Sequence, residues 1–242
     1  MDEEKIEKEE KGIGDYLFSW KRKFDNFWYH YKVAFIMSVF VIVFIIFCIT
    51  QCASKVKNDV SIAYIGPKEI NAEQYNAIQA ELDALLGEDL NGDGKIHAGF
   101  TQFLYMTSLQ IENAKAQGQA VDMQSIMTVQ TQIELEFATG NIIVYFIDRN
   151  VYNELSKRQG LFMDLEDALG YMPENINDAC SIELGSLPCW DYYEGLHDFP
   201  ASTIVAVRDI LLSESDNEKI KEQYEKNLLF FKRLVEFTFG EE

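Results

Sequence analysis

The spacing of apolar and polar residues divides the chain into three parts. Residues 33–54 form an almost uninterrupted apolar run, and residues from 58 onward alternate short apolar runs with polar stretches. A helix of about 20 apolar residues is long enough to cross roughly 30 Å of hydrocarbon. We therefore expect an acidic tail with an aromatic and basic juxtamembrane segment at 1–32, a transmembrane helix at 33–54 and a folded domain at 58–242.

The apolar run predicts a membrane anchor. Val33–Thr50 carries no charge, whereas the core helix of a soluble domain is rarely apolar on every face. The run starts only after 32 residues, many of them acidic, which is atypical of a cleaved signal peptide. Basic residues are more numerous before the run (Lys21, Arg22, Lys23, Lys32) than after it. This bias predicts a cell-membrane protein with a cytoplasmic N-terminus and an extracytoplasmic domain.

The pattern after residue 58 predicts an α/β fold. Val60–Ile65 has the pattern of a strand, and Asn71 with Gln74 has the spacing of a capping box for a helix that exits at Gly87. The continuous apolar run Ile142–Ile147 is typical of a strand at the centre of a parallel sheet. We expect a mostly parallel sheet with flanking helices. Further strands are expected at 96–105 and 203–207. Helices are expected at 120–137 (with Met123 and Met127 filling the core), at 150–158 and near the C-terminus, and a loop-rich stretch at about 171–200.

Part of this pattern resembles a known class of proteins. Residues 130–169 place a helix, Gly140, a buried strand ending in Asp148, a short helix, Gly160 and then Asp164 in succession. This order resembles bacterial extracellular solute-binding proteins, and with the N-terminal anchor the chain resembles single-pass membrane proteins of Gram-positive-type bacteria. The resemblance implies a single solute-binding-like lobe. The 188 residues after Ser54 are few for two lobes, so we do not expect ligand capture by closure of a cleft between lobes.

The charge of the chain is strongly negative. It holds 21 basic and 40 acidic residues, a net charge of −19, which argues against nucleic acid as a partner because phosphates would be repelled. Residues 1–32 hold 7 basic and 8 acidic groups, which leaves 14 basic and 32 acidic groups for the rest. Nearly all the net charge therefore lies in the domain, and it favours cationic partners or metal ions.

One loop has the first half of a calcium-binding pattern. Asp89, Asn91 and Asp93 supply oxygen ligands at alternating positions, and the backbone carbonyl of Lys95 is a further ligand. The twelfth position is Phe100 instead of a bidentate acid, so a complete EF-hand is excluded. Weak calcium binding is one interpretation. The alternative is a metal-free turn, because Asn-Gly and Asp-Gly favour positive φ without an ion.

A ligand site is expected at the carboxyl ends of the strands, following the general rule for open α/β sheets. The residues at these ends are Gly66, Tyr105, Asp148 and Arg208. Trp190, next to Tyr192 and Tyr193, is a candidate aromatic wall for a sugar or a peptide, and aromatic packing under a loop is the alternative.

Catalytic chemistry is not indicated, because no nucleophile stands at a recognised spacing from a histidine. Cys180 and Cys189 are spaced to close a small disulfide loop, or they remain free thiols. We expect a non-catalytic, membrane-anchored domain that binds or senses a small solute. The alternative is an envelope scaffold or protein-interaction module without a small ligand.

Overall fold

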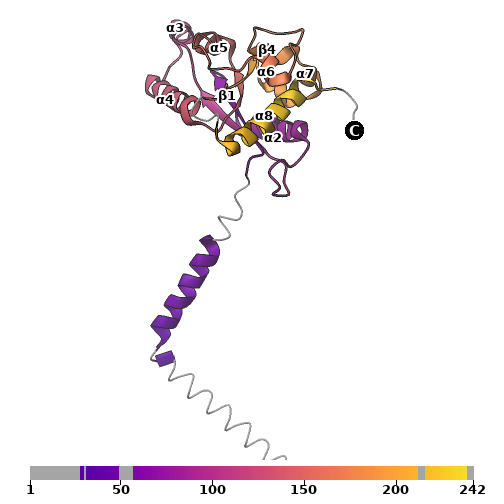
Figure 1. Cartoon of the computed structure of the whole chain (residues 1–242). Helices are drawn as coiled ribbons and strands as arrows, with labels where there is room; N and C mark the ends of the chain where they lie inside the picture. Colours follow the sequence, from indigo (N-terminus) through magenta and orange to yellow (C-terminus); the bar gives the residue numbers. More distant parts are fainter. Residues whose placement is uncertain (1–27, 30, 49–56, 212–215, 239–242) are drawn as a thin grey trace, which may run out of the picture. The chain divides into compact units, whose positions relative to one another are not determined.

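The computed structural model (Figure 1) describes residues 28–29, 31–48, 57–211 and 216–238. The chain forms two compact units, residues 1–55 and 56–242, and each is considered by itself. The tail and aromatic segment expected at 1–27 and the end of the apolar run at 49–54 lie outside the described residues.

The first unit contains an apolar helix. Tyr31–Cys48 has a mean hydropathy of 2.6, and none of this segment is buried within the chain. Because no core covers it, it is not an internal helix of a globular domain. Among the described residues it is the one helix that is long and apolar enough to cross a membrane, which fits an anchor or a signal sequence.

The second unit is built on a five-stranded sheet with the order β2-β1-β3-β5-β4. β1 pairs in parallel with β2 and β3, whereas β5 is antiparallel to both β3 and β4. The strands are β1 (Val60–Gly66), β2 (Ala98–Leu104), β3 (Val144–Ile147), β4 (Ser181–Glu183) and β5 (Ile204–Val207). The α/β class is confirmed, with β3 at the centre, but the sheet is mixed where we expected it to be mostly parallel.

Helices cover both faces of the sheet. One face packs against α2 (Ala72–Leu86), α6 (Leu165–Leu169), α7 (Pro188–Tyr192) and α8 (Glu218–Val235). The other packs against α4 (Met123–Thr139) and α5 (Arg149–Leu155). Helix α3 (Ser108–Ala116) follows β2, and two 3-10 turns, η1 (Leu184–Ser186) and η2 (Glu194–Asp198), flank α7. Figure 1 shows α2 and α8 beside each other.

Helix α2 shows how local sequence sets the boundaries of an element. The Asn71 side chain accepts hydrogen bonds from the backbone N–H groups of Glu73 and Gln74, and the Gln74 side chain returns a bond to the Asn71 N–H. Gly87 ends the helix with φ of 71°, in the left-handed region that glycine adopts without strain. The predicted capping box and exit are both confirmed.

Helix α2 also covers the outer edge of β2. The Asp83 carboxylate accepts from the Ala98 N–H, Gln79 donates to the Ala98 carbonyl, and the Tyr75 hydroxyl donates to the Phe100 carbonyl. These bonds occupy backbone groups that would otherwise be open to another strand. The edge is thereby protected from pairing with a second chain over its first half.

One other expectation was wrong, and one was incomplete. Met123 and Met127 of α4 are exposed, Met127 to 64%, because the helix turns Ile133 and Phe137 toward the sheet instead. The stretch 171–200, expected to be loop-rich, also contains four elements that we had not predicted: β4, η1, α7 and η2. These elements are three to five residues long, too short for a periodic pattern to predict them.

Candidate functional site

Three of the four residues expected at the carboxyl ends of the strands do lie together. Gly66, Tyr105 and Asp148 end or follow the parallel strands β1, β2 and β3. The Tyr105 N–H donates to the Gly66 carbonyl at 2.9 Å, and the Asp148 N–H donates to the Ile65 carbonyl at 2.8 Å. The structure therefore brings these three residues to one edge of the sheet.

Arg208 lies at the opposite edge, which corrects our expectation. It follows β5, and because β5 runs antiparallel to β3, its carboxyl end meets the start of β3. The Arg208 N–H donates to the Ile143 carbonyl, and its guanidinium donates to the Gly140 carbonyl and lies 5.5 Å from the centre of the Tyr224 ring. With only 2% of its surface exposed, Arg208 is a structural residue of the core.

Asp148 is engaged by its own chain. Its carboxylate caps α5 by accepting from the Asn150 and Val151 N–H groups, and it also accepts from the Gln110 side chain at 2.8 Å. A carboxylate with these partners orders the loop after β3 and the start of α3. It is not positioned as an open ligand group.

Gly66 makes room for a buried tyrosine. A Cβ atom at Gly66 would lie 2.3 Å from the Tyr64 hydroxyl oxygen, which is far inside van der Waals contact. Burial, together with the negative charge of Asp148, raises the pKa of Tyr64 to about 12. Glycine at this position is therefore explained by packing, without a ligand.

Tyr105 borders a small closed cavity. The cavity has a volume of about 20 Å³ and lies between α4 and α5. A bidentate pair closes it, in which Arg158 donates to both carboxylate oxygens of Glu134 at 2.6 and 2.5 Å. This volume holds about one water molecule and excludes a solute.

The calcium-like loop is held together by its own carboxylates. Asp89 accepts from the N–H groups of Asn91, Gly92 and Gly94, and the bond from Gly94 lowers the pKa of the carboxyl group. The Asp93 carboxylate likewise accepts from the Lys95 N–H. These bonds fit a metal-free turn. No group of three or more acidic, histidine or cysteine side chains able to hold a metal ion occurs in the described part of the chain. Calcium binding stays a prediction.

Asp59, which directly precedes β1, holds the same loop through hydrogen bonds to its backbone. It is only 4% exposed, and its carboxylate accepts from the N–H groups of Leu90, Asn91 and His97. Sequence reasoning missed this residue because its partners are 31 to 38 positions away.

Among the described residues, Cys180 and Cys189 are free thiols. Cys189 is buried in the core under α2 and α8, whereas Cys180 packs against the core on the other face of the sheet. Burial raises the pKa of each thiol to about 12, with Asp164 contributing at Cys180. Both are therefore protonated at neutral pH and poor nucleophiles. The free-thiol alternative is the one that the structure contains.

The aromatic residues after Pro188 separate into two groups. Trp190 packs on His197, with ring centres 4.6 Å apart, and its carbonyl oxygen bonds the His197 ring at 2.8 Å. Tyr192 and Tyr193 instead meet Phe237 at the end of α8, at centre distances of 5.1 and 5.3 Å. Trp190, which we expected in an aromatic wall with Tyr192 and Tyr193, packs against the core and His197 instead, whereas the two tyrosines contact Phe237, a residue that we had not predicted.

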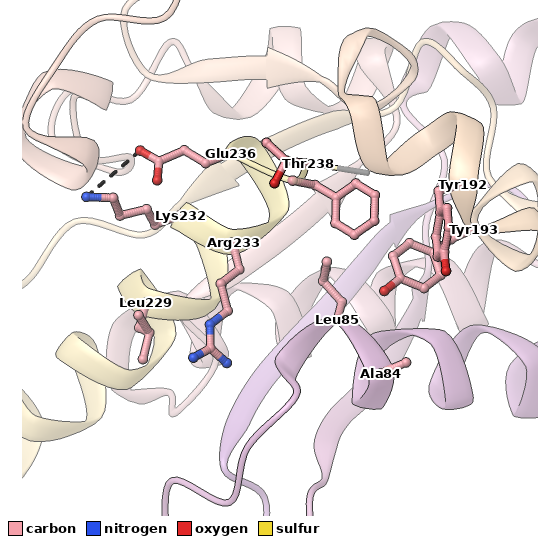
Figure 2. Close-up of a pocket in the computed structure, with 10 residues that line it drawn as sticks. Ala84, Leu85, Tyr192, Tyr193, Leu229, Lys232, Arg233, Glu236 and Thr238 are labelled. Carbon is pink, nitrogen blue, oxygen red and sulfur yellow. Dashed lines mark ion pairs between the residues drawn. The ribbon is translucent and has the colours of Figure 1, made fainter. Parts of the chain in front are cut away.

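These rings border the largest cavity that we describe, here called the aromatic cleft. It has a volume of about 950 Å³ and lies between the C-terminal ends of α2 and α8 and the chain around Tyr192 (Figure 2). Its apolar lining combines aromatic and aliphatic side chains, and the polar lining comes from α8 and the residues after it. The lining residues are Ala84, Leu85, Tyr192, Tyr193, Leu229, Lys232, Arg233, Glu236, Phe237 and Thr238.

The charged side chains of the aromatic cleft have partners. Arg233 donates to the Leu86 carbonyl at the end of α2 and to the Glu88 carboxylate. Lys232 lies 3.9 Å from Glu236, and Figure 2 shows this pair across the cleft from the two tyrosines. Burial is the main cause of the raised pKa of Tyr193. The cleft therefore combines aromatic rings with two basic side chains, Lys232 and Arg233, that are already paired with carboxylates of the same chain.

Comparison of the chain with protein-family models, curated proteins and solved structures found no match. The geometry of the domain is thus the basis for a functional assignment.

Proposed function

We propose that this chain is a non-catalytic binding domain held at the membrane by its N-terminal helix, and that the aromatic cleft is its ligand site. The observation that carries the proposal is the cleft itself. Its volume of about 950 Å³ falls at the upper end of the range for ligand sites, roughly 300–1,000 Å³. Three aromatic rings with a few polar groups at one side are the lining that such sites use.

The position of the site differs from the strand ends that the sequence favoured. At that edge Asp148 caps a helix, and the cavity beside Tyr105 holds about one water molecule. The aromatic cleft lies in the helical layer over the sheet and is open to solvent, with Tyr192 exposed to 56%. Binding there needs no second lobe.

The resemblance to a solute-binding lobe belongs to the same proposal. A five-stranded α/β sheet with helices on both faces supports it. The basic residues before the apolar helix support a cytoplasmic N-terminus and an extracytoplasmic domain. The protonated thiols at Cys180 and Cys189 favour binding over covalent catalysis.

Native mass spectrometry of the full chain, extracted in mild detergent without chelator, tests the proposal. We expect an adduct of defined mass on the wild type that is lost in Tyr192→Ala, because this exposed ring forms one wall of the cleft. Ile176→Ala is the control, since Ile176 is an exposed apolar residue outside the cleft lining. A bare wild-type mass, or an adduct that persists in Tyr192→Ala, would contradict the proposal.

A protein-interaction module is the second candidate, and exposed apolar residues on α3 and α4, outside the aromatic cleft, favour it. Leu109 on α3 and Met127 and Leu135 on α4 are all more than 60% exposed, which is unusual for large apolar side chains. If these residues bind a protein, the double variant Met127→Lys with Leu135→Lys loses a stoichiometric partner, whereas Tyr192→Ala retains it. Loss of the same partner from both variants would count against a site separate from the cleft.

A further inference from the structure

The arrangement of the three rings restricts where a ligand can sit in the aromatic cleft. Tyr192 and Tyr193 have ring centres 4.9 Å apart and are inclined at 84°, and Phe237 lies 5.1 and 5.3 Å from them. At these distances the rings contact one another, so no group fits between them. A ligand therefore packs against their outer surfaces. This geometry does not fit a cage that encloses a lone ammonium group.

Acidic residues outnumber basic ones in the cleft lining and its sequence neighbours. Asp191 and Glu194 are exposed and flank the two tyrosines in the sequence. The basic groups of the cleft, Lys232 and Arg233, already pair with Glu236 and Glu88. With these two sequence neighbours and the two paired acids, four acidic groups stand against two basic ones in the cleft and in the chain next to its tyrosines.

The domain as a whole adds to this local field. Residues 33–242 hold 14 basic and 32 acidic groups, so the surface attracts cations and repels anions at a distance of about a Debye length, roughly 8 Å at physiological salt. An anionic ligand would meet repulsion with no unpaired arginine or lysine in the cleft lining to offset it. A ligand that carries both positive charge and an apolar group fits the negative charge of the domain and the aromatic rings of the cleft.

We propose that the aromatic cleft binds a cationic peptide segment through one aromatic or aliphatic anchor residue. This inference rests on the proposed function, because it names the ligand class of the same cleft. The anchor packs on the outer surfaces of Tyr192 and Phe237, above the aliphatic side chains of Leu85 and Leu229. The neighbouring basic side chains of the peptide face Asp191 and Glu194, and a basic group over the Tyr192 ring gains a cation–π interaction.

Binding of short labelled peptides to the full chain tests this inference. The chain is placed in nanodiscs of zwitterionic lipid, so that basic peptides do not bind the bilayer itself, and fluorescence anisotropy reports binding. The first peptide has one tryptophan between two pairs of lysines. One matched peptide replaces the lysines by glutamates, and another replaces the tryptophan by glycine. We expect the first to bind at least about 10-fold more tightly than either.

Variants separate the contributions of the rings and the charges. Tyr192→Ala should weaken the lysine–tryptophan peptide about 10-fold or more, because it removes the exposed ring. The double variant Asp191→Asn with Glu194→Gln should weaken it about 3- to 10-fold and reduce the effect of added salt. Glu112→Gln with Glu174→Gln is the matched control, since both residues are exposed acids away from the cleft lining, and it should change affinity less than about 2-fold.

The outcomes distinguish the ligand class from the site. If the glutamate or glycine peptide binds as tightly as the first and Tyr192→Ala still weakens binding, the cationic class is wrong and the cleft remains the site. If none of the peptides binds, the inference is wrong, and the adduct measurement alone judges the proposed function. If the lysine–tryptophan peptide binds wild type and Tyr192→Ala equally well, while circular dichroism shows both to be folded, the cleft is not where it binds.

Discussion

Removal of the Asp59 carboxylate should destabilise the domain more than removal of a carboxylate that accepts only one hydrogen bond. Three backbone N–H groups of the segment 90–97 donate to this carboxylate, at 2.8 to 2.9 Å. A hydrogen bond to a charged group contributes about 1.5–3 kcal/mol. The Asn91 N–H has a second acceptor in Asp89, and water can reach parts of the loop, so the full sum is not lost. We expect Asp59→Ala to lower the free energy of unfolding by about 2–4 kcal/mol.

The variant Asp59→Asn should be milder. An asparagine retains one carbonyl oxygen, which can still accept from Leu90 and Asn91, but its amide group cannot accept from His97. The expected cost is about 1–2 kcal/mol, or one hydrogen bond. Asp93→Ala is the control in the same loop, because that exposed side chain accepts a single bond from Lys95 and should cost about 0.5–1 kcal/mol.

Chemical denaturation of the full chain in detergent micelles, followed by near-UV circular dichroism, measures these differences. A shift in midpoint at unchanged slope reports a change in stability. The reasoning is refuted if Asp59→Ala costs less than the Asp93→Ala control, or if Asp59→Asn costs as much as Asp59→Ala. The first result would mean that the three N–H groups do not depend on this carboxylate, and the second that one carbonyl oxygen of asparagine does not retain two of the three bonds.

Three further predictions concern other parts of the domain. Gly66→Ala should cost about 1–3 kcal/mol in thermal unfolding, because the new Cβ lies 2.3 Å from the Tyr64 hydroxyl oxygen, and adding Tyr64→Phe should recover part of that loss; no recovery would contradict the clash. If the loop binds calcium, millimolar calcium should raise the melting temperature of wild type but not of Asp93→Ala, and a wild type indifferent to both calcium and chelator would exclude the site. Arg158 lowers the pKa of Glu134, so the pair stabilises above the unfolded pKa of glutamate, about 4.3, and this contribution is lost as pH falls through the folded value. Arg158→Gln should therefore be less stable than wild type at neutral pH, and the difference should shrink as the pH falls below the folded pKa of Glu134; a difference that is unchanged in acid would contradict the linkage.

Elements defined by local interactions were predictable from the sequence. The boundaries of α2 depend on Asn71, Gln74 and Gly87, all within or next to the helix, so their residue types were sufficient. The central position of β3 was predictable as well, because a strand covered on both faces must be apolar at consecutive positions. In each case the signal and the structure occupy the same few residues.

Strand direction was not predictable, and this explains the misplacement of Arg208. A strand has the same alternation of residues in either direction, so nothing within Ile204–Val207 indicates that β5 runs antiparallel to β3. The direction depends on the route of the chain through β4, α7 and η2. The exposed methionines of α4 have a related cause, because helical periodicity defines a face but not whether another element covers it.

Polar side chains at the carboxyl ends of the strands are bonded to one another, and the aromatic cleft lies in a different part of the domain. At the carboxyl edge Lys68 pairs with Asp198, and Gln102 donates to the Lys68 carbonyl, so the side chains that would meet a second lobe there are bonded within this one. The cleft instead joins residues 84–85, 192–193 and 229–238, which lie far apart in the sequence. Because all three segments pack on one face of one sheet, the proposed site needs no second lobe to form it. Binding should therefore leave the radius of gyration in small-angle X-ray scattering unchanged, whereas a compaction on binding would indicate closure against another surface.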